Sequence, residues 1–96
     1  MDIEKIVQTL RTLRNEIRRD YKADIVGVFG SYARGEQREG SDLDVLVNFR
    51  EKANLLDLVG LGQFLEEILH CRVDVVSKRA VREEIRPYVE NDLIPV

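Results

Sequence analysis

Two aspartates lie two residues apart at the start of an apolar segment that reads SDLDVLV over residues 41–47. This pattern is typical of a β-strand, and because strand side chains alternate between the two faces of a sheet, Asp42 and Asp44 must point the same way. Two carboxylates in one small site raise each other's pKa and repel, unless a cation lies between them. The pair therefore predicts a metal-ion site.

The ligand atoms narrow the choice of metal. Carboxylate oxygens without neighbouring His or Cys suit Mg²⁺ or Mn²⁺, and Mg²⁺ is usually held by one or two carboxylates together with the phosphates of a substrate. Gly30 and Ser31 supply the expected phosphate site, since they follow an apolar run at residues 25–29. Glycine lets the backbone approach a ligand closely, and serine can cap a following turn and donate its hydroxyl to a phosphate oxygen. We expect a nucleoside triphosphate with Mg²⁺ as substrate.

A third carboxylate, Asp74, lies among β-branched residues in a strand predicted over residues 72–76. The order strand, helix, strand predicts a right-handed parallel crossover, which would place this strand beside the one that carries Asp42 and Asp44. An aspartate between valines on an interior strand is costly to bury without a partner or an ion. We therefore expect Asp74 in the same site, as a third ligand.

The elements that position these residues follow from hydrophobic spacing. Apolar residues at helical spacing predict an amphipathic helix over residues 3–19, which Asp2 can cap. The apolar run at residues 25–29 predicts a strand covered on both faces, so this strand should be central or nearly so. A short helical turn should follow Ser31, and then an exposed, mobile polar segment over residues 35–40.

The second half of the chain continues the alternation of strand and helix. A helix is predicted over residues 55–69, with Asn54 as its cap. The last helical stretch should begin at residue 77 or 78, and Pro87 must either kink it or begin a second short helix. The order of elements predicts an α/β domain with a small mixed sheet and flanking helices.

Several further side chains can have a functional or a purely structural role. Arg34 can steady a triphosphate, and it can equally be a solvated arginine on an exposed turn. Tyr32 and Tyr88 are interpreted as packing residues. The only histidine, His70, is predicted at a helix end with no motif around it, which argues against Ser31 as a hydrolase nucleophile.

Composition limits the class of protein. Ninety-six residues with 44% hydrophobic content fit one domain over residues 1–96. A single cysteine, Cys71, and the lack of a signal sequence or long apolar run predict a cytoplasmic protein that no membrane holds. The net charge of -3 argues against long nucleic acid as a partner, because tight binding there draws on excess positive charge.

The spacing of these residues resembles a known signature. Gly30 and Ser31, ten intervening residues, Asp42 and Asp44, and the later Asp74 resemble the motif of the minimal nucleotidyltransferases of the DNA polymerase β superfamily. The resemblance covers nearly the whole chain, since the order of elements is also that of the family. It implies the polymerase β-like fold, triphosphate contact by the Gly-Ser turn, and two Mg²⁺ ions bound by the three aspartates.

Members this short are similar to the antitoxin half of toxin–antitoxin modules whose toxin is a small helical HEPN ribonuclease. The resemblance implies transfer of AMP from ATP to a tyrosine of that toxin, which silences it. The helix over residues 55–69 has apolar residues on more than one face, and this fits a protein partner. Leu56 and Val59 are the members that we expect outside the core. A homo-oligomer is a further possibility that the sequence leaves open.

Other interpretations stay open at this point. Asp42 and Asp44 can be two exposed acids at a strand entrance, although the Gly-Ser turn and Asp74 make that less attractive. The same chemistry can serve a small-molecule acceptor, as in drug-modifying relatives, but those carry an added domain. The chain can also be a non-catalytic antitoxin that neutralises its toxin by occlusion, although the presence of all three carboxylates argues against lost chemistry.

Overall fold

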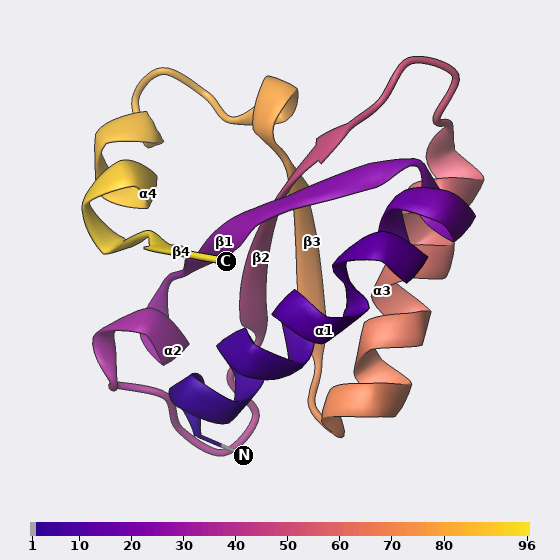
Figure 1. Cartoon of the computed structure of the whole chain (residues 1–96). Coiled ribbons are helices and arrows are strands. Elements are labelled where there is room, and N and C mark those ends of the chain that lie inside the picture. The colour runs from indigo at the N-terminus through magenta and orange to yellow at the C-terminus, as the bar shows by residue number, and fades with distance from the viewer. Residues whose placement is uncertain (1) are drawn as a thin grey trace.

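The fold is a four-stranded mixed sheet with its two long helices on one face, as the computed structural model shows for residues 2–96 (Figure 1). The strand order is β3-β2-β1-β4, with β3 parallel to β2 and with β1 antiparallel to both of its neighbours. The elements in chain order are α1 Ile3–Tyr21, β1 Ala23–Phe29, α2 Ser31–Arg34, β2 Leu43–Phe49, α3 Leu55–Leu69, β3 Val73–Ser77, a 3-10 turn Lys78–Ala80, α4 Arg86–Asp92 and β4 Ile94–Pro95.

Both long helices begin at the predicted caps. The side chain of Asp2 accepts a hydrogen bond of 2.9 Å from the Lys5 backbone N–H at the start of α1. At the start of α3, Asn54 and Asp57 form a capping box, in which each side chain accepts a hydrogen bond from the other's backbone N–H. These bonds satisfy donors that a helix start otherwise leaves free. The sequence therefore fixes where each long helix begins.

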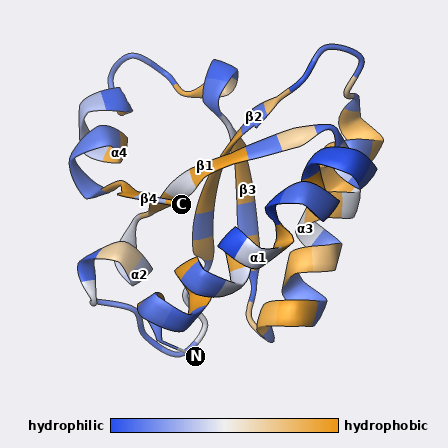
Figure 2. Ribbon diagram, in the orientation of Figure 1, coloured by the Kyte–Doolittle hydropathy of each residue, from blue (hydrophilic) through white to orange (hydrophobic). Residues whose placement is uncertain are grey.

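The main core lies between these two helices and the sheet. Its buried members come from α1, α3, β1 and β2, and hydrophobic residues are prominent along α3 and the strands in Figure 2. Side chains that are completely buried include Leu10, Ile17, Val45, Leu61 and Leu65. Burial on the pattern of an amphipathic helix confirms that the α1 stripe is core.

The opposite face of the sheet is only partly covered. A smaller cluster forms there around Leu46, Val81 and Val89, where α4 packs on the sheet. Asp44 lies two residues before Leu46 on β2, so its side chain is on this thinly covered face. The site of the predicted chemistry is therefore open on the side away from α1 and α3.

The structure confirms the predicted α/β class and corrects several details. Pro87 begins a second short helix, α4, and does not kink a continuous one. The strand β4 was not predicted, because two residues carry no periodic signal; it pairs with β1 and so makes β1 an interior strand. The strand β3 lies at the edge of the sheet, and is therefore not the interior strand that the sequence predicts for Asp74.

The apolar surface of α3 extends outside the core, as predicted. Leu55, Leu56 and Val59 are 70%, 80% and 49% exposed, while Leu61 and Leu65 on the same helix are fully buried. No helix among residues 2–96 has the length and apolar character needed to cross a membrane.

This contrast gives a test of the core assignment. Leu61→Ala should lower the free energy of unfolding by about 2–5 kcal/mol, because it removes buried methyl groups and leaves a cavity. Leu56→Ala, the matched exposed control, should change it by less than about 0.5 kcal/mol. Urea denaturation measures both values, and equal losses in the two variants would contradict the assignment.

Candidate functional site

Strand register places Asp44 and Asp74 beside each other on one face of the sheet, with Asp42 two residues before Asp44 in the chain. Asp44 on β2 is paired with Phe29 at the end of β1 and with Asp74 on the parallel strand β3. Directly paired residues in a sheet point to the same face, and Asp42 precedes Asp44 by two residues. The crossover predicted from the sequence is therefore present, and it brings Asp74 beside Asp44.

Asp44 has the most perturbed carboxyl group of the site. Its pKa is raised to about 6, chiefly because the half-buried carboxylate loses solvation, and further by the negative charges of Asp74 and Asp42. The guanidinium of Arg34 opposes this rise in the pKa. The site thus concentrates negative charge that the surrounding side chains only partly neutralise.

Asp42 is also incompletely satisfied. Its Oδ1 atom is buried and has no hydrogen-bond partner, although Nε of Arg72 lies 3.1 Å away as an ion pair without hydrogen-bond geometry. Most buried polar atoms in proteins have a partner, so an exception calls for an explanation. Arg72 thus places a positive charge beside this oxygen without giving it a hydrogen bond.

Gly30 is required at the turn for a steric reason. Its φ angle is +78°, a conformation that favours glycine, and a Cβ atom built there would overlap Oδ2 of Asp44. The carboxylate of Asp44 therefore lies directly over the Gly30 backbone. This close approach joins the Gly-Ser turn to the acidic group of β2.

The structure corrects the expected role of Ser31 in capping. Gly30 occupies the N-cap position of α2, and no side chain caps this helix. Ser31 is the first residue of the helix. The turn is closed by a backbone hydrogen bond of 3.1 Å, which the Arg34 N–H donates to the Gly30 carbonyl. The hydroxyl of Ser31 is thus not used for capping.

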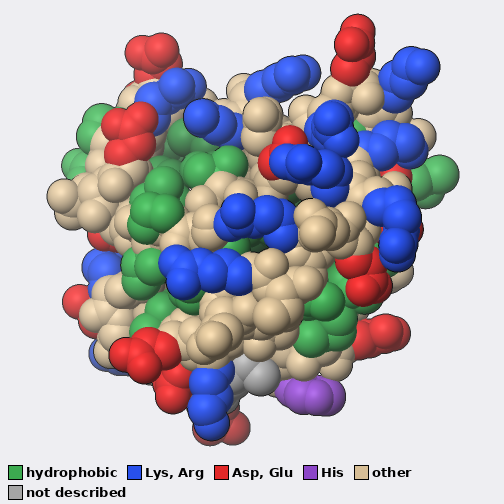
Figure 3. Space-filling view, viewed as in Figure 1, with side chains coloured by type: hydrophobic (Ala, Val, Ile, Leu, Met, Phe, Trp, Pro, Cys, Tyr) green, Lys and Arg blue, Asp and Glu red, His purple; other side chains and the backbone are tan. Residues whose placement is uncertain are grey.

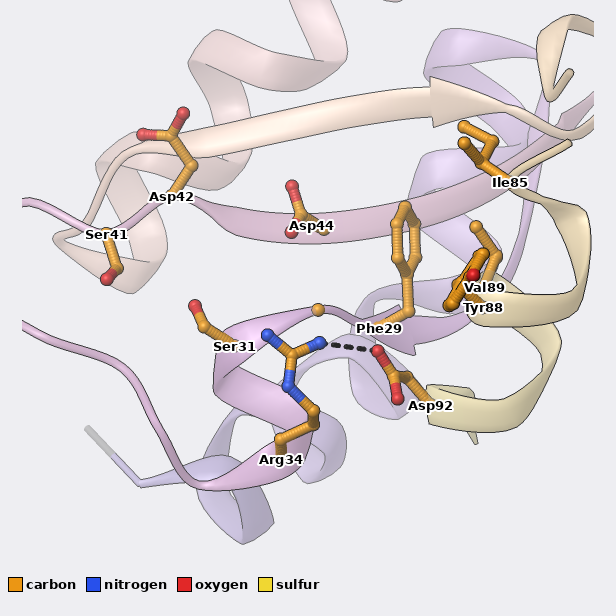
Figure 4. Close-up of a pocket in the computed structure, with 11 residues that line it drawn as sticks. Phe29, Ser31, Arg34, Ser41, Asp42, Asp44, Ile85, Tyr88, Val89 and Asp92 are labelled. Atoms are coloured by element: carbon orange, nitrogen blue, oxygen red, sulfur yellow. Dashed lines mark hydrogen bonds and ion pairs between the residues drawn. The ribbon is translucent and has the colours of Figure 1, made fainter.

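Arg34 is held at the side of the site by two carboxylates. It forms ion pairs of 2.6 Å with Asp92 on α4 and of 3.0 Å with Glu36 (Figure 4). Only 14% of the Asp92 side chain is exposed, so this pair is the better shielded of the two. Their hydrogen bonds raise the pKa of Arg34 further. The pair ties α2 to α4 across the site.

A cavity of about 520 Å³ opens between these elements, a size in the range of small-molecule sites. The close-up in Figure 4 shows its side chains converging from β1, α2, β2 and α4. One wall is polar and the other is mostly apolar. The polar wall holds Gly30, Ser31, Arg34, Ser41, Asp42 and Asp44, and the α4 side holds Ile85, Tyr88, Val89 and Asp92, with Phe29 from β1.

Asp74 differs from the other two acids. It is exposed, lies on the edge strand, and does not line this cavity. The premise that an interior strand buries Asp74 is therefore wrong, and its expected role as a ligand rests on register with Asp44 alone.

These residues fit a divalent cation by chemistry. The donors are carboxylate oxygens, the ligands that Mg²⁺ and Mn²⁺ prefer. A cation would stabilise the half-buried charged form of Asp44, whose pKa is raised chiefly by lost solvation and further by Asp74 and Asp42. Within residues 2–96, however, no three His, Cys, Asp or Glu side chains are already gathered closely enough to hold an ion.

Sequence reasoning missed the contribution of α4. Tyr88 was interpreted as a packing residue, but it is 72% exposed and lines the cavity, whereas Tyr32 does pack against the main core. Asp92 was not considered at all. The available signal was Pro87, which starts a separate short helix that is free to fold back over the site.

Comparisons with known proteins show the family of this chain. The model of the nucleotidyltransferase domain family matches residues 10–94. The chain is 38% identical to the protein adenylyltransferase MntA of Thermococcus cleftensis, covering 100% of this chain and 97% of that protein.

Two solved structures share the fold. One, assigned as a minimal nucleotidyltransferase, is 43% identical with a TM-score of 0.75, covering 100% of this chain and 97% of that one. The other is a toxin–antitoxin crystal structure with AMP-PNP, 28% identical with a TM-score of 0.65, covering 80% of this chain and 64% of that one.

The raised pKa of Asp44 predicts a pH-dependent stability. The folded-state pKa of about 6 exceeds the ordinary value of 3.8, so the folded protein takes up a proton as pH falls through 6 and gains stability relative to pH 7. In metal-free buffer, Asp44→Asn should therefore melt at a higher temperature than the wild type at pH 7. The difference should shrink at pH 5.

Thermal melts of both proteins at pH 7 and pH 5, in the presence of a chelator, measure this effect. Glu51→Gln, a matched change of an exposed loop carboxylate, should show no such pattern. A gain from Asp44→Asn that is the same at both pH values would count against a raised pKa of Asp44.

Proposed function

We propose that this chain, which belongs to the nucleotidyltransferase domain family and has protein adenylyltransferases as relatives, transfers AMP from ATP to a tyrosine of a HEPN ribonuclease toxin. It would thereby act as the antitoxin of that toxin. The observation that carries the proposal is the placement of Asp42, Asp44 and the Gly-Ser turn on one cavity, with Asp74 in register beside them. A structural relative is a toxin–antitoxin complex with a nucleotide analogue, which supports the same assignment.

The polar wall would hold the triphosphate. Ser31 offers a first-turn hydroxyl that caps no helix, Arg34 offers a guanidinium, and Gly30 lets the turn lie close against the carboxylate of Asp44. Asp42, Asp44 and Asp74 would hold two Mg²⁺ ions, which supply charge neutralisation at the triphosphate and lower the pKa of the acceptor hydroxyl.

The transfer itself is an in-line displacement. The phenolic oxygen of the acceptor tyrosine forms a bond to the α-phosphorus of ATP, the bond to the bridging oxygen breaks, and pyrophosphate leaves. The phenolic proton must move to a base, and Asp74 is the carboxylate that stands at the open side of the site. Asp74 is exposed on an edge strand, so a side chain of another protein could reach it.

The docking face for the toxin is the exposed apolar surface of α3. Val59 and Asp74 line the same shallow groove between α3 and β3, so this surface is continuous with the acceptor side of the site. Leu55 and Leu56 extend it away from the groove. A macromolecular acceptor that covered these side chains would place a tyrosine near Asp74, and would bury apolar area that is now in water.

Transfer can be tested directly with purified proteins. Labelled ATP, Mg²⁺ and the cognate toxin should give label on a toxin tyrosine, and both Asp42→Asn and Asp44→Asn should abolish it because each removes a carboxylate that the ions need. Mass spectrometry of the toxin locates the label, and Glu51→Gln serves as the control that keeps activity. A stable complex that never carries label would support neutralisation by occlusion instead.

The docking face makes a separate prediction. Leu56→Lys and Val59→Lys should each weaken toxin binding at least about tenfold, since a hot-spot side chain typically contributes 2 kcal/mol or more. ATP binding should be unchanged. Gln8→Lys, at an exposed position of α1, adds the same charge elsewhere and is the control. If calorimetry found unchanged toxin affinity for both α3 variants, docking would have to use another surface.

A further inference from the structure

One wall of the cavity is apolar, and a triphosphate has no apolar group that could pack against it. Phosphates and divalent ions would use the polar wall, and the facing wall is made by Tyr88 and Val89 of α4, its N-cap Ile85, and Phe29 of β1. Hydrophobic side chains also reach the surface around α4 in the space-filling view (Figure 3). A ligand that fills the whole cavity must therefore be strongly charged at one end and apolar at the other.

Two residues of this wall are unusually open to water. Tyr88 is 72% exposed and Ile85 is 48% exposed, whereas Val89 of the same helix is 6% exposed and belongs to the smaller core. The core beneath α4 is therefore complete without Tyr88 and Ile85. Their apolar area, on the rim of a concave site, is available to a planar ring.

The orientation of α4 toward the polar wall is fixed by an ion pair. Asp92, one turn after Tyr88 on α4, binds Arg34 at 2.6 Å, and both residues line the cavity. The aromatic wall and the phosphate wall are thus joined directly (Figure 4). A ligand bound across both would contact a surface that is already assembled.

We propose that Tyr88, with Ile85 beside it, forms the nucleobase-binding wall of this site, on which the base of the nucleoside triphosphate stacks. The proposal rests on the function proposed above and adds the recognition of the base. Stacking on an aromatic ring needs only the planar face of the base, and it is the interaction that an exposed tyrosine offers at a cavity rim. Tyr88 is accordingly a binding residue, and not part of the smaller core.

Calorimetric titration with two probes tests the wall. ATP with Mg²⁺ carries a base, and tripolyphosphate with Mg²⁺ does not. Tyr88→Ala should weaken ATP binding about tenfold, which corresponds to about 1.4 kcal/mol, and should leave tripolyphosphate binding unchanged. Tyr88→Phe keeps the ring and should bind ATP like the wild type. Ile85→Ala should weaken ATP binding less than Tyr88→Ala does.

Gln8→Ala is the control, because it truncates an exposed side chain on α1 away from the cavity, and it should bind both probes normally. Unchanged ATP affinity in Tyr88→Ala, or equal losses for both probes, would overturn the proposed wall while leaving nucleotidyl transfer intact. A wild-type protein that binds neither probe would overturn the proposed function, and this inference with it.

Discussion

The crowding of negative charge around Asp44 is the constraint on which the site depends. Sheet register places Asp74 beside Asp44, and Asp42 precedes Asp44 by two residues in the chain. The backbone of Gly30 lies close against the carboxylate of Asp44. Half burial then raises its pKa to about 6, so the fold keeps a carboxylate where it is poorly solvated. Such an arrangement weakens the metal-free protein and favours the binding of cations.

The remaining architecture can be understood as support for this arrangement. The two long helices and their large core cover one face of the sheet and supply most of the buried apolar area. The other face is left thinly covered, and it is there that the carboxylates and the cavity lie. A domain of 96 residues has little surface to spare, so stability and chemistry are assigned to opposite faces of one sheet.

The helix α4 has two functions in this scheme. Val89 closes the smaller core, while Asp92 reaches across to Arg34 and so fixes the helix against the phosphate side of the cavity. On the other side of the molecule, α3 separates its roles in the same way, with Leu61 in the core and Leu56 in water. Each helix therefore packs with one stripe and exposes another to solvent.

The sequence by itself determined what depends on local spacing: the caps at Asp2 and Asn54, the strand that carries Asp42 and Asp44, and the glycine before Ser31. It also predicted the parallel crossover that pairs Asp44 with Asp74, since connection handedness is nearly invariant. Only the tertiary structure decided that Asp74 lies on an edge strand, and that α4 folds back to form a wall of the cavity. Those features arise from contacts between residues far apart in the chain, and the two-residue strand β4 is too short to leave a periodic pattern.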